Sequence, residues 1–353
     1  MKTRKIIEFS FILLLAIPVL PLFGQEEKED KKSETKFDAS TFILEHIADS
    51  HEWHILTKKS GESVAIYLPV ILYNREKGLD LFSSKKLAHG HEYKGYKLEE
   101  EGELKGRIVS LNEEGQIDEK NFPLDFSITK TVIGMMFAAL VGLLLFISLS
   151  RSYKKTGISH PKGIQSFLEP IILFVRDDIA IPNIGEHNYG KYMPYLLTVF
   201  FFILLNNIMG LIPFPPPFGA NVTGNIAVTL TLAMFTFLIT QFSGNKTYWR
   251  HIFAAPGVPL WLLPIMIPVE IIGMFSKPFA LMVRLFANIT AGHIIVLSLV
   301  SLIFIFKSLA VAPVSIIFVI FMDCLELLVA FLQAYVFTLL SALFISLAVP
   351  ENH

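Results

Sequence analysis

Cysteine is almost absent from the 353-residue sequence, which contains Cys324 alone. A disulfide within the chain is therefore excluded, and one cysteine inside an apolar run gives no indication of the redox compartment. The sequence has no basic stripe, so nucleic acid is not an expected partner. The formal net charge is −1, and most charged residues lie in residues 25–125 and in connecting loops. Net charge therefore says little about partners, and the uncharged segments are more informative.

Charged side chains are missing from three apolar stretches, residues 131–150, 192–212 and 226–243. Two longer apolar stretches follow at 258–306 and 308–349, and each contains few charged residues. A spanning helix needs about 20 residues, so each of the last two is about twice as long as a perpendicular helix requires. With 53% hydrophobic residues and 31 Phe, the sequence predicts an all-α polytopic membrane protein with about five membrane-crossing helices. The last two are expected to be strongly tilted or broken and to form a hairpin.

The N-terminal residues have the pattern of a signal peptide. Basic residues precede an apolar stretch at 9–23, and a charged linker follows it. We interpret residues 1–24 as a signal peptide; a retained anchor is the alternative, because no clear A-x-A cleavage site is present. Residues 25–125 are then an extracytoplasmic region. It is expected to be small, either α/β or irregular, with one or two short strands at 62–74 interrupted by Pro69.

Basic loops indicate the orientation of the membrane domain at residues 126–353. Residues 151–162 follow the first span and contain four Lys or Arg, and residues 245–251 follow the third span and are also basic. By the positive-inside rule both loops are cytoplasmic, and five crossings leave the C-terminus there as well. An interfacial amphipathic helix is predicted at 164–179. Its apolar face comprises Ile164, Phe167, Leu168, Ile171, Val175 and Ile179, opposite Gln165, Glu169, Arg176 and Asp177.

Arg284 lies in the middle of the fourth apolar stretch, where a guanidinium needs a partner. Glu270 is fourteen residues earlier, on the same helical face but about 21 Å away along the axis. Asn288 is four residues after Arg284 and shares that face, whereas His293 points to the opposite side. No acid of this stretch lies at the depth of Arg284. The carboxylate that balances it is therefore expected to belong to another protein.

The last apolar stretch contributes Asp323, Glu326 and Gln333. Glu326 and Gln333 share one helical face, and Asp323 lies one turn before Glu326 on a neighbouring stripe. If the last two stretches pair antiparallel around a turn at 307–308, His293 lies at a similar depth to Asp323 and Glu326. Because histidine titrates near neutral pH, a histidine that faces two carboxylates in a bilayer predicts a proton or ion relay.

The stretch "SKPFALMVRLFANITAGH" (276–293), followed by "CLELLVAFLQAYVFTLLSALFISLA", resembles subunit a of F-type ATP synthases, over roughly residues 125–350. The resemblance implies the stationary proton-channel subunit of the Fo sector. In that family two offset half-channels and an essential arginine couple H⁺ translocation to c-ring rotation and ATP synthesis. Arg284 matches that c-ring-facing arginine. Asn288, His293, Glu326 and Gln333 resemble residues of the outer half-channel, Asp323 is a further candidate there, and Glu270 resembles an acid of the cytoplasmic half-channel.

The resemblance also implies partners and a location. The expected partners are the c-ring, subunit b of the peripheral stalk, the remaining ATP synthase subunits and membrane lipid. The expected location is the inner (plasma) membrane of a bacterium, with the N-terminus external and the C-terminus cytoplasmic. No catalytic site, cofactor or metal is implied.

Other interpretations of the same residues remain open from the sequence. A proton-coupled secondary transporter could use these charges, but it should show an internal repeat, and the sequence shows none. An intramembrane metalloprotease could bind zinc through His293, Asp323 and Glu326, although only one of them is a histidine. His293 and Glu326 could also form a purely structural polar pair. Lys277 is expected to be an interfacial anchor, and Glu270 could instead cap a helix break beside a proline.

Overall fold

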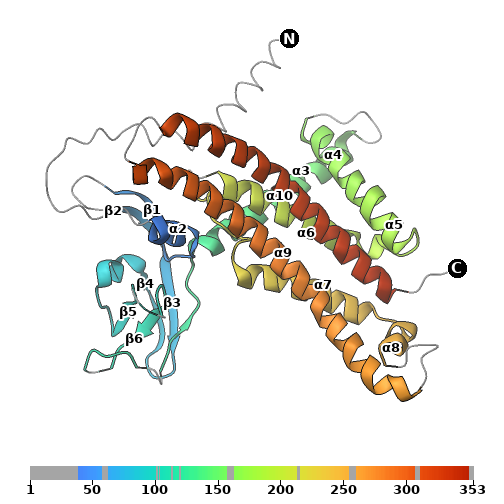
Figure 1. Cartoon of the computed structure of the whole chain (residues 1–353), viewed down its shortest axis with the longest axis horizontal. Helices are drawn as coiled ribbons and strands as arrows, with labels where there is room; N and C mark the ends of the chain where they lie inside the picture. The colour runs from blue at the N-terminus through green and yellow to red at the C-terminus, as the bar shows by residue number, and fades with distance from the viewer. Residues whose placement is uncertain are drawn as a thin grey trace, which may run out of the picture. The chain divides into compact units, whose positions relative to one another are not determined.

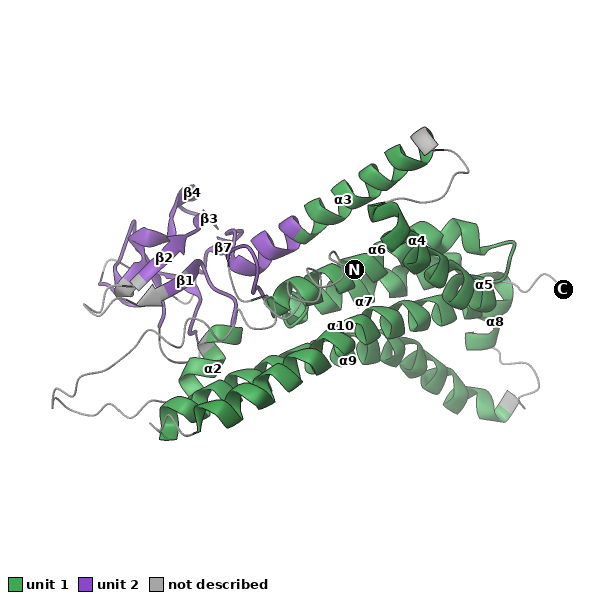
Figure 2. Ribbon diagram, turned by 90° about the horizontal axis from the view of Figure 1, so that it is seen from above, with its two compact units in different colours: residues 1–47, 138–212, 221–353 green, residues 48–137, 213–220 purple. Residues whose placement is uncertain are grey.

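The structure is a computed structural model, and it describes residues 39–57, 63–100, 102, 104–112, 114–118, 121–156, 163–212, 215–253, 260–306 and 311–349 (Figure 1). The predicted signal peptide, the linker after it, the predicted turn at 307–308 and residues 350–353 lie outside the described residues. The chain forms two compact units (Figure 2). Unit 1 comprises Met1–Ile47, Ala138–Ile212 and Asn221–His353, and unit 2 comprises Ala48–Phe137 and Pro213–Ala220.

Unit 2 contains three small antiparallel sheets. Their strands are β1 (Glu52–Thr57), β2 (Ser63–Tyr67), β3 (Pro69–Asn74), β4 (Gly78–Ser83), β5 (Tyr96–Leu98), β6 (Ile108–Ser110) and β7 (Leu124–Asp125). The sheets are β1-β2, β4-β3-β7 and β5-β6. The prediction of two short strands around Pro69 is confirmed. Proline is tolerated as the first residue of a strand, and Pro69 begins β3.

The core of unit 2 packs against one face of the β4-β3-β7 sheet. It contains Val70, Leu72, Phe82, Leu87, Tyr96 and Ile108. Asp80 is the acid on this face, and it accepts hydrogen bonds from Lys94 Nζ at 2.5 Å and from Tyr96 OH at 3.2 Å. His51 is also buried, and its Nε2 lies 3.0 Å from Asp125 Oδ2. These polar groups are therefore paired, as burial requires.

Unit 1 is helical, and five of the described helices are long and apolar enough to cross a membrane. They are α3 (Lys130–Thr156), whose first residues belong to unit 2, α6 (Tyr189–Leu211), α7 (Ile226–Ser243), α9 (Leu263–Phe306) and α10 (Ala312–Ala348). The shorter helices are α2 (Ala39–Ile47), α4 (Ile164–Phe174), α5 (Ile181–Ile184) and α8 (Lys246–Phe253). The predicted fold class, five membrane-crossing helices with a small N-terminal strand region, is confirmed.

The two C-terminal helices α9 and α10 pack along one another, and α10 also packs on α6 and α7 (Figure 1). Ser315 in the first turn of α10 donates a hydrogen bond to the carbonyl oxygen of Leu299 in α9, at 2.9 Å. α9 has 44 residues, so it is roughly 66 Å long against about 30 Å for a bilayer core. Pro268 and Pro278 lie inside it without ending it. The alternative in which Glu270 caps a helix break is therefore wrong.

The predicted amphipathic helix at 164–179 differs from the structure in two ways. α4 ends at Phe174 and a π-helix continues from Val175 to Ala180, and the wider π turn shifts the 3.6-residue phase. Gln165, expected on the polar face, is buried because its Oε1 accepts a hydrogen bond from Ser152 Oγ at 2.8 Å. Ile164 and Phe167, of the predicted apolar face, are exposed at the protein surface, where the apolar side chains of an interfacial helix meet lipid. Leu168 and Ile179, of the same predicted apolar face, are buried within the protein.

Candidate functional site

Arg284 lies on an exposed face of α9, between the buried residues Leu281 and Leu285 of the same turn. Within the described parts of the chain, no carboxylate lies within ion-pair distance of its guanidinium. Asn288 follows one turn later and is also exposed. Apolar packing thus anchors the helix while the guanidinium points away from unit 1 without a counter-charge from the described residues.

Small side chains flank Arg284 along the same exposed face. Ala280, Ala287 and Ala291 are all exposed, and together with Arg284 they recur every three to four residues, which is one face of an α-helix. Small residues let the backbone of a neighbouring helix approach closely in a membrane. This stripe of α9, comprising Ala280, Arg284, Ala287, Asn288 and Ala291, is called the arginine stripe below.

His293 and Glu326 are brought together from α9 and α10. His293 Nδ1 lies 3.7 Å from Glu326 Oε2, and the two side chains are 19% and 12% exposed. The prediction that they lie at similar depth is confirmed. The separation is longer than a hydrogen bond, and Glu326 Oε1 is buried with no hydrogen-bond partner among the described residues. One water molecule could join the two groups.

Gly292 explains how Glu326 approaches α9 so closely, and sequence reasoning missed this residue. A Cβ placed on Gly292 would lie 2.5 Å from Glu326 Oε1 and 3.0 Å from its Cδ. Real Cβ atoms do not approach other atoms so closely, so any larger residue here would push the carboxyl away. The sequence did offer one signal, because Gly292 lies in the interior of a predicted helix. Glycine destabilises a helix interior, so its presence there indicates that another group packs closely against the backbone.

The remaining predicted site residues are spread along the two helices. Gln333 is buried in α10, two turns after Glu326, and Asp323 is partly buried one turn before it. Glu270 is partly buried in α9, about 21 Å along the axis from Arg284. Asn288 and His293 point to different sides of α9, as predicted. The structure thus assembles one pair, His293 with Glu326, rather than a single cluster.

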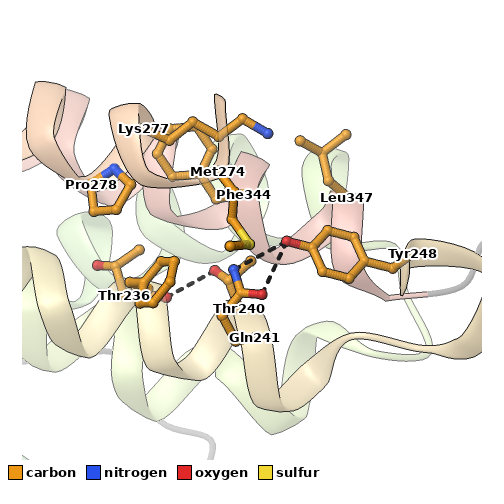
Figure 3. Close-up of a pocket in the computed structure, with 10 residues that line it drawn as sticks. Thr236, Thr240, Gln241, Tyr248, Met274, Lys277, Pro278, Phe344 and Leu347 are labelled. Carbon is orange, nitrogen blue, oxygen red and sulfur yellow. Dashed lines mark hydrogen bonds between the residues drawn. The ribbon is translucent and has the colours of Figure 1, made fainter. Parts of the chain in front are cut away.

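A second polar region, also missed from the sequence, lies between α7, α8, α9 and α10. It surrounds a small cavity of about 20 Å³ lined by Thr240, Gln241, Tyr248, Lys277 and Phe344, among others (Figure 3). Gln241 Nε2 donates a hydrogen bond to Tyr248 OH at 3.1 Å. The volume is sufficient for about one water molecule. We call this region the inner cavity.

A chain of hydroxyl groups leads away from the inner cavity. Thr236, which also lines it, has its Oγ1 3.2 Å from Ser341 Oγ in α10 and 2.6 Å from Tyr195 OH in α6. Each hydroxyl group can both donate and accept a hydrogen bond. These side chains come from three helices distant in sequence, so spacing along one helix could not reveal them.

Metal-binding residues are not gathered in the part of the chain that the structure describes. No group of three or more His, Cys, Asp or Glu side chains there could hold a metal ion. Asp323 does not join His293 and Glu326 in a ligand set. The zinc-protease interpretation therefore gains no support from the described residues.

The long apolar helices, the lone arginine and the His–Glu pair between two helices define a multi-pass membrane protein of the ion-conducting class. Residues 132–346 match the family model described as ATP synthase A chain, and residues 42–126 match a domain of unknown function (DUF8433). The chain therefore belongs to the ATP synthase subunit a family. It is a non-catalytic proton-channel subunit of the Fo sector of an F-type ATP synthase. As such it works with other Fo and F1 subunits.

Curated relatives support this membership. The chain is 50% identical to ATP synthase subunit a of Chloroherpeton thalassium over 236 residues, which is 65% of this chain and 69% of the relative. It is 54% identical to ATP synthase subunit a 2 of Chlorobaculum tepidum over 235 residues, 65% of each chain. It is 48% identical to the Myxococcus xanthus subunit a over 237 residues, 65% of this chain and 75% of the relative.

Proposed function

We propose that Arg284 is the fixed cation that faces the c-ring and binds its carboxylates in turn. The observation that carries this proposal is the exposed guanidinium in the middle of α9, with no ion-pair partner among the described residues. A buried or lipid-facing charge requires a partner. A carboxylate on a rotating neighbour supplies one, and the small residues of the arginine stripe allow that neighbour to come close.

Electrostatics explains how this cation couples proton flow to rotation. A protonated c-ring carboxyl group can face lipid, whereas an ionised one is very costly there. Arginine stays protonated at every accessible pH, so an acid that reaches Arg284 must release its proton. The same positive charge prevents protons from passing directly between the two half-channels. Protons therefore cross only when the ring turns.

The outer half-channel is proposed to run along the contact between α9 and α10. His293 and Glu326 exchange protons through an intervening water, because their 3.7 Å separation is too long for a direct hydrogen bond. Asn288, Asp323 and Gln333 line the same route as polar neighbours. Asp323 and Gln333 are assigned to it by their helical spacing from Glu326. Asn288, which shares a face with Arg284 rather than with His293, is assigned to it by the family resemblance alone.

The inner half-channel is proposed to include Glu270 and the inner cavity. Five of the ten residues that line the inner cavity are polar, and the cavity has room for a water molecule, which supports this assignment. Lys277, seven residues before Arg284, lines the cavity. In this position it adds positive charge near the inner path as well as anchoring the helix.

The partners and orientation are proposed from the family and from the loop charges. The c-ring and subunit b of the peripheral stalk are the direct partners in the bacterial inner membrane. Residues 1–24 are a signal peptide, residues 25–125 lie outside the cytoplasm, and residues 126–353 form the membrane domain with a cytoplasmic C-terminus. Basic residues near the end of α3 and in α8 support this orientation.

Substitution of Arg284 by alanine tests the proposal. We expect Arg284→Ala to abolish ATP-driven proton pumping in inverted vesicles, while the complex still assembles, because the side chain is not part of the packed core. The matched control is Arg176→Ala, since Arg176 is paired with Asp177 outside the spans. The control should pump normally. Retention of coupled pumping by Arg284→Ala would overturn the proposal.

A further inference from the structure

The β4-β3-β7 sheet of unit 2 has an apolar outer face, opposite the core. One face forms the core, and the other carries Ile71, Tyr73, Leu79, Leu81, Leu124 and the next residue but one, Phe126. Leu79, Leu81 and Phe126 are 69%, 66% and 64% exposed. An antiparallel sheet that covers a core on one side normally shows polar side chains on the other. An outer face without charge therefore indicates that something covers it.

Strand register arranges these six side chains in two rows. Tyr73 pairs with Leu79 on one side and with Leu124 on the other. Ile71 pairs with Leu81, and its carbonyl accepts a hydrogen bond from the Phe126 amide at 2.9 Å. Directly paired residues on neighbouring strands point to the same side of the sheet. The rows are therefore Leu79–Tyr73–Leu124 and Leu81–Ile71–Phe126, and together we call them the apolar sheet face.

The apolar sheet face is held close to the start of a membrane span. Phe126 precedes Lys130, the first residue of α3, by four residues, which even a fully extended chain could stretch to only about 14 Å. The connection is also fixed within unit 2. Thr129 Oγ1 donates to Asp49 Oδ2 at 2.8 Å, and the Thr131 amide donates to Asp49 Oδ1 at 3.1 Å. Phe126, at one edge of the face, therefore stays within about 14 Å of the residue where α3 begins.

We propose that the apolar sheet face of unit 2 rests on the surface of the lipid bilayer at the end where α3 begins. Lipid at the boundary between headgroups and acyl chains fits this surface, because that zone accepts aliphatic and aromatic side chains without demanding charge. Tyr73 is an aromatic residue of the kind enriched there, and Phe126 is of the kind that interfacial helices bury there. This surface lies in the part of the chain that matches a domain of unknown function, and the inference is independent of the proton path.

Fluorescent labelling of the intact complex tests the proposal. In a Cys324→Ser background, Leu81→Cys and Leu79→Cys are each labelled with an environment-sensitive dye, and the complex is reconstituted in phosphatidylcholine–phosphatidylglycerol vesicles. Gln116→Cys, an exposed position of unit 2 outside the sheet, is the control. Quenching is then measured with a doxyl phosphatidylcholine labelled near the headgroup and, separately, with aqueous iodide.

Lipid contact predicts that dyes at positions 79 and 81 emit at shorter wavelength than the dye at 116. They should lose fluorescence to the doxyl lipid and resist iodide, whereas position 116 should show the reverse. Equal iodide quenching at all three positions would overturn the proposal in favour of a solvent-exposed sheet. Protection of positions 79 and 81 from both quenchers would overturn it in favour of a protein partner.

Discussion

Gly292 has no side chain, and this allows α9 and α10 to lie close together at Glu326. The Glu326 carboxyl group occupies space that a Cβ at this position would need. The absence of a side chain at Gly292 therefore allows the carboxyl group to lie at its observed place beside His293. At the residue scale, the geometry of the proposed outer path depends as much on this glycine as on the two titratable groups.

Replacement of Gly292 by alanine is expected to impair proton transfer more than folding. The displaced group is the end of a flexible side chain, so the complex should still assemble, but the His293–Glu326 separation must change. We expect ATP-driven pumping in inverted vesicles to fall several-fold per assembled complex.

Gly273→Ala is the matched control in the same helix. A Cβ at Gly273 would meet no described atom within 4 Å, and alanine in a helix interior is favoured over glycine by roughly 0.5–1 kcal/mol. The control should therefore pump at least as well as the unmodified protein. Equal pumping by the two variants would show that the close approach at Gly292 has no role in transfer.

Helix packing in unit 1 uses polar side chains as well as apolar ones. Asn207 in α6 donates from Nδ2 to the carbonyl oxygen of Ala330 in α10 at 3.4 Å, and it accepts from Thr223 Oγ1 at 2.6 Å. These groups are buried, so water does not compete for them. The amide thus ties α6 to α10 a little more than one turn after Glu326 and supports the position of that helix.

Removal of this amide should weaken the contact between α6 and α10. Hydrogen bonds between membrane helices contribute about 0.6 kcal/mol on average and at most about 1.7. We expect Asn207→Ala to lower the thermal midpoint of the purified complex measurably. Asn206→Ala is the control, because the Asn206 amide donates within its own helix, to the Phe202 carbonyl. A larger loss of stability in the control would contradict this assignment.

In unit 2, the contact between β4 and the segment leading to β5 is expected to depend on pH, because it includes the Asp80 carboxylate. The hydrogen bond from Lys94 holds the pKa of the Asp80 carboxyl below its usual value of 3.8, although burial opposes this shift. A carboxyl with a lowered folded-state pKa stabilises the fold above its unfolded pKa. That contribution is lost as the pH falls through the folded value, which here lies below 3.8.

Acidification to about pH 3 should therefore loosen β4 and β5, with Asp80 as one cause. We expect amide hydrogen exchange, corrected for intrinsic rate, to speed up in these strands between about pH 6 and pH 3. Asp80→Asn should show a smaller change over the same range, since it has no charge to lose. Glu114→Gln, which removes an exposed acid, should behave like the unmodified protein. An unchanged pH response in Asp80→Asn would exclude the Asp80–Lys94 contact as a cause.

At the scale of the whole molecule, hydropathy and helical spacing predicted most of the membrane architecture. The span at 226–243 matches α7, and the last two stretches match α9 and α10 within a few residues. Long uncharged runs are a strong signal because the bilayer requires them. Counting residues from the hairpin turn also placed His293 beside Glu326.

The features that the sequence did not reveal depend on contacts between distant segments. The inner cavity needs side chains from α7, α8, α9 and α10, and the apolar sheet face needs the register of three strands. Gln165 was misplaced because its burial depends on one hydrogen bond to Ser152. Periodicity within one helix or strand shows which side chains share a face. It does not show which other segment packs against that face or forms hydrogen bonds with it.

The alanines of the arginine stripe have a mechanical consequence. Bulky side chains would interlock with those of a passing helix, and each step of rotation would have to lift one set over the other. Methyl groups leave only shallow ridges, so a helix that moves past the arginine stripe would meet little steric resistance from its alanines. Under the proposed function, a passing carboxylate is attracted at Arg284, which is the charged member of the arginine stripe.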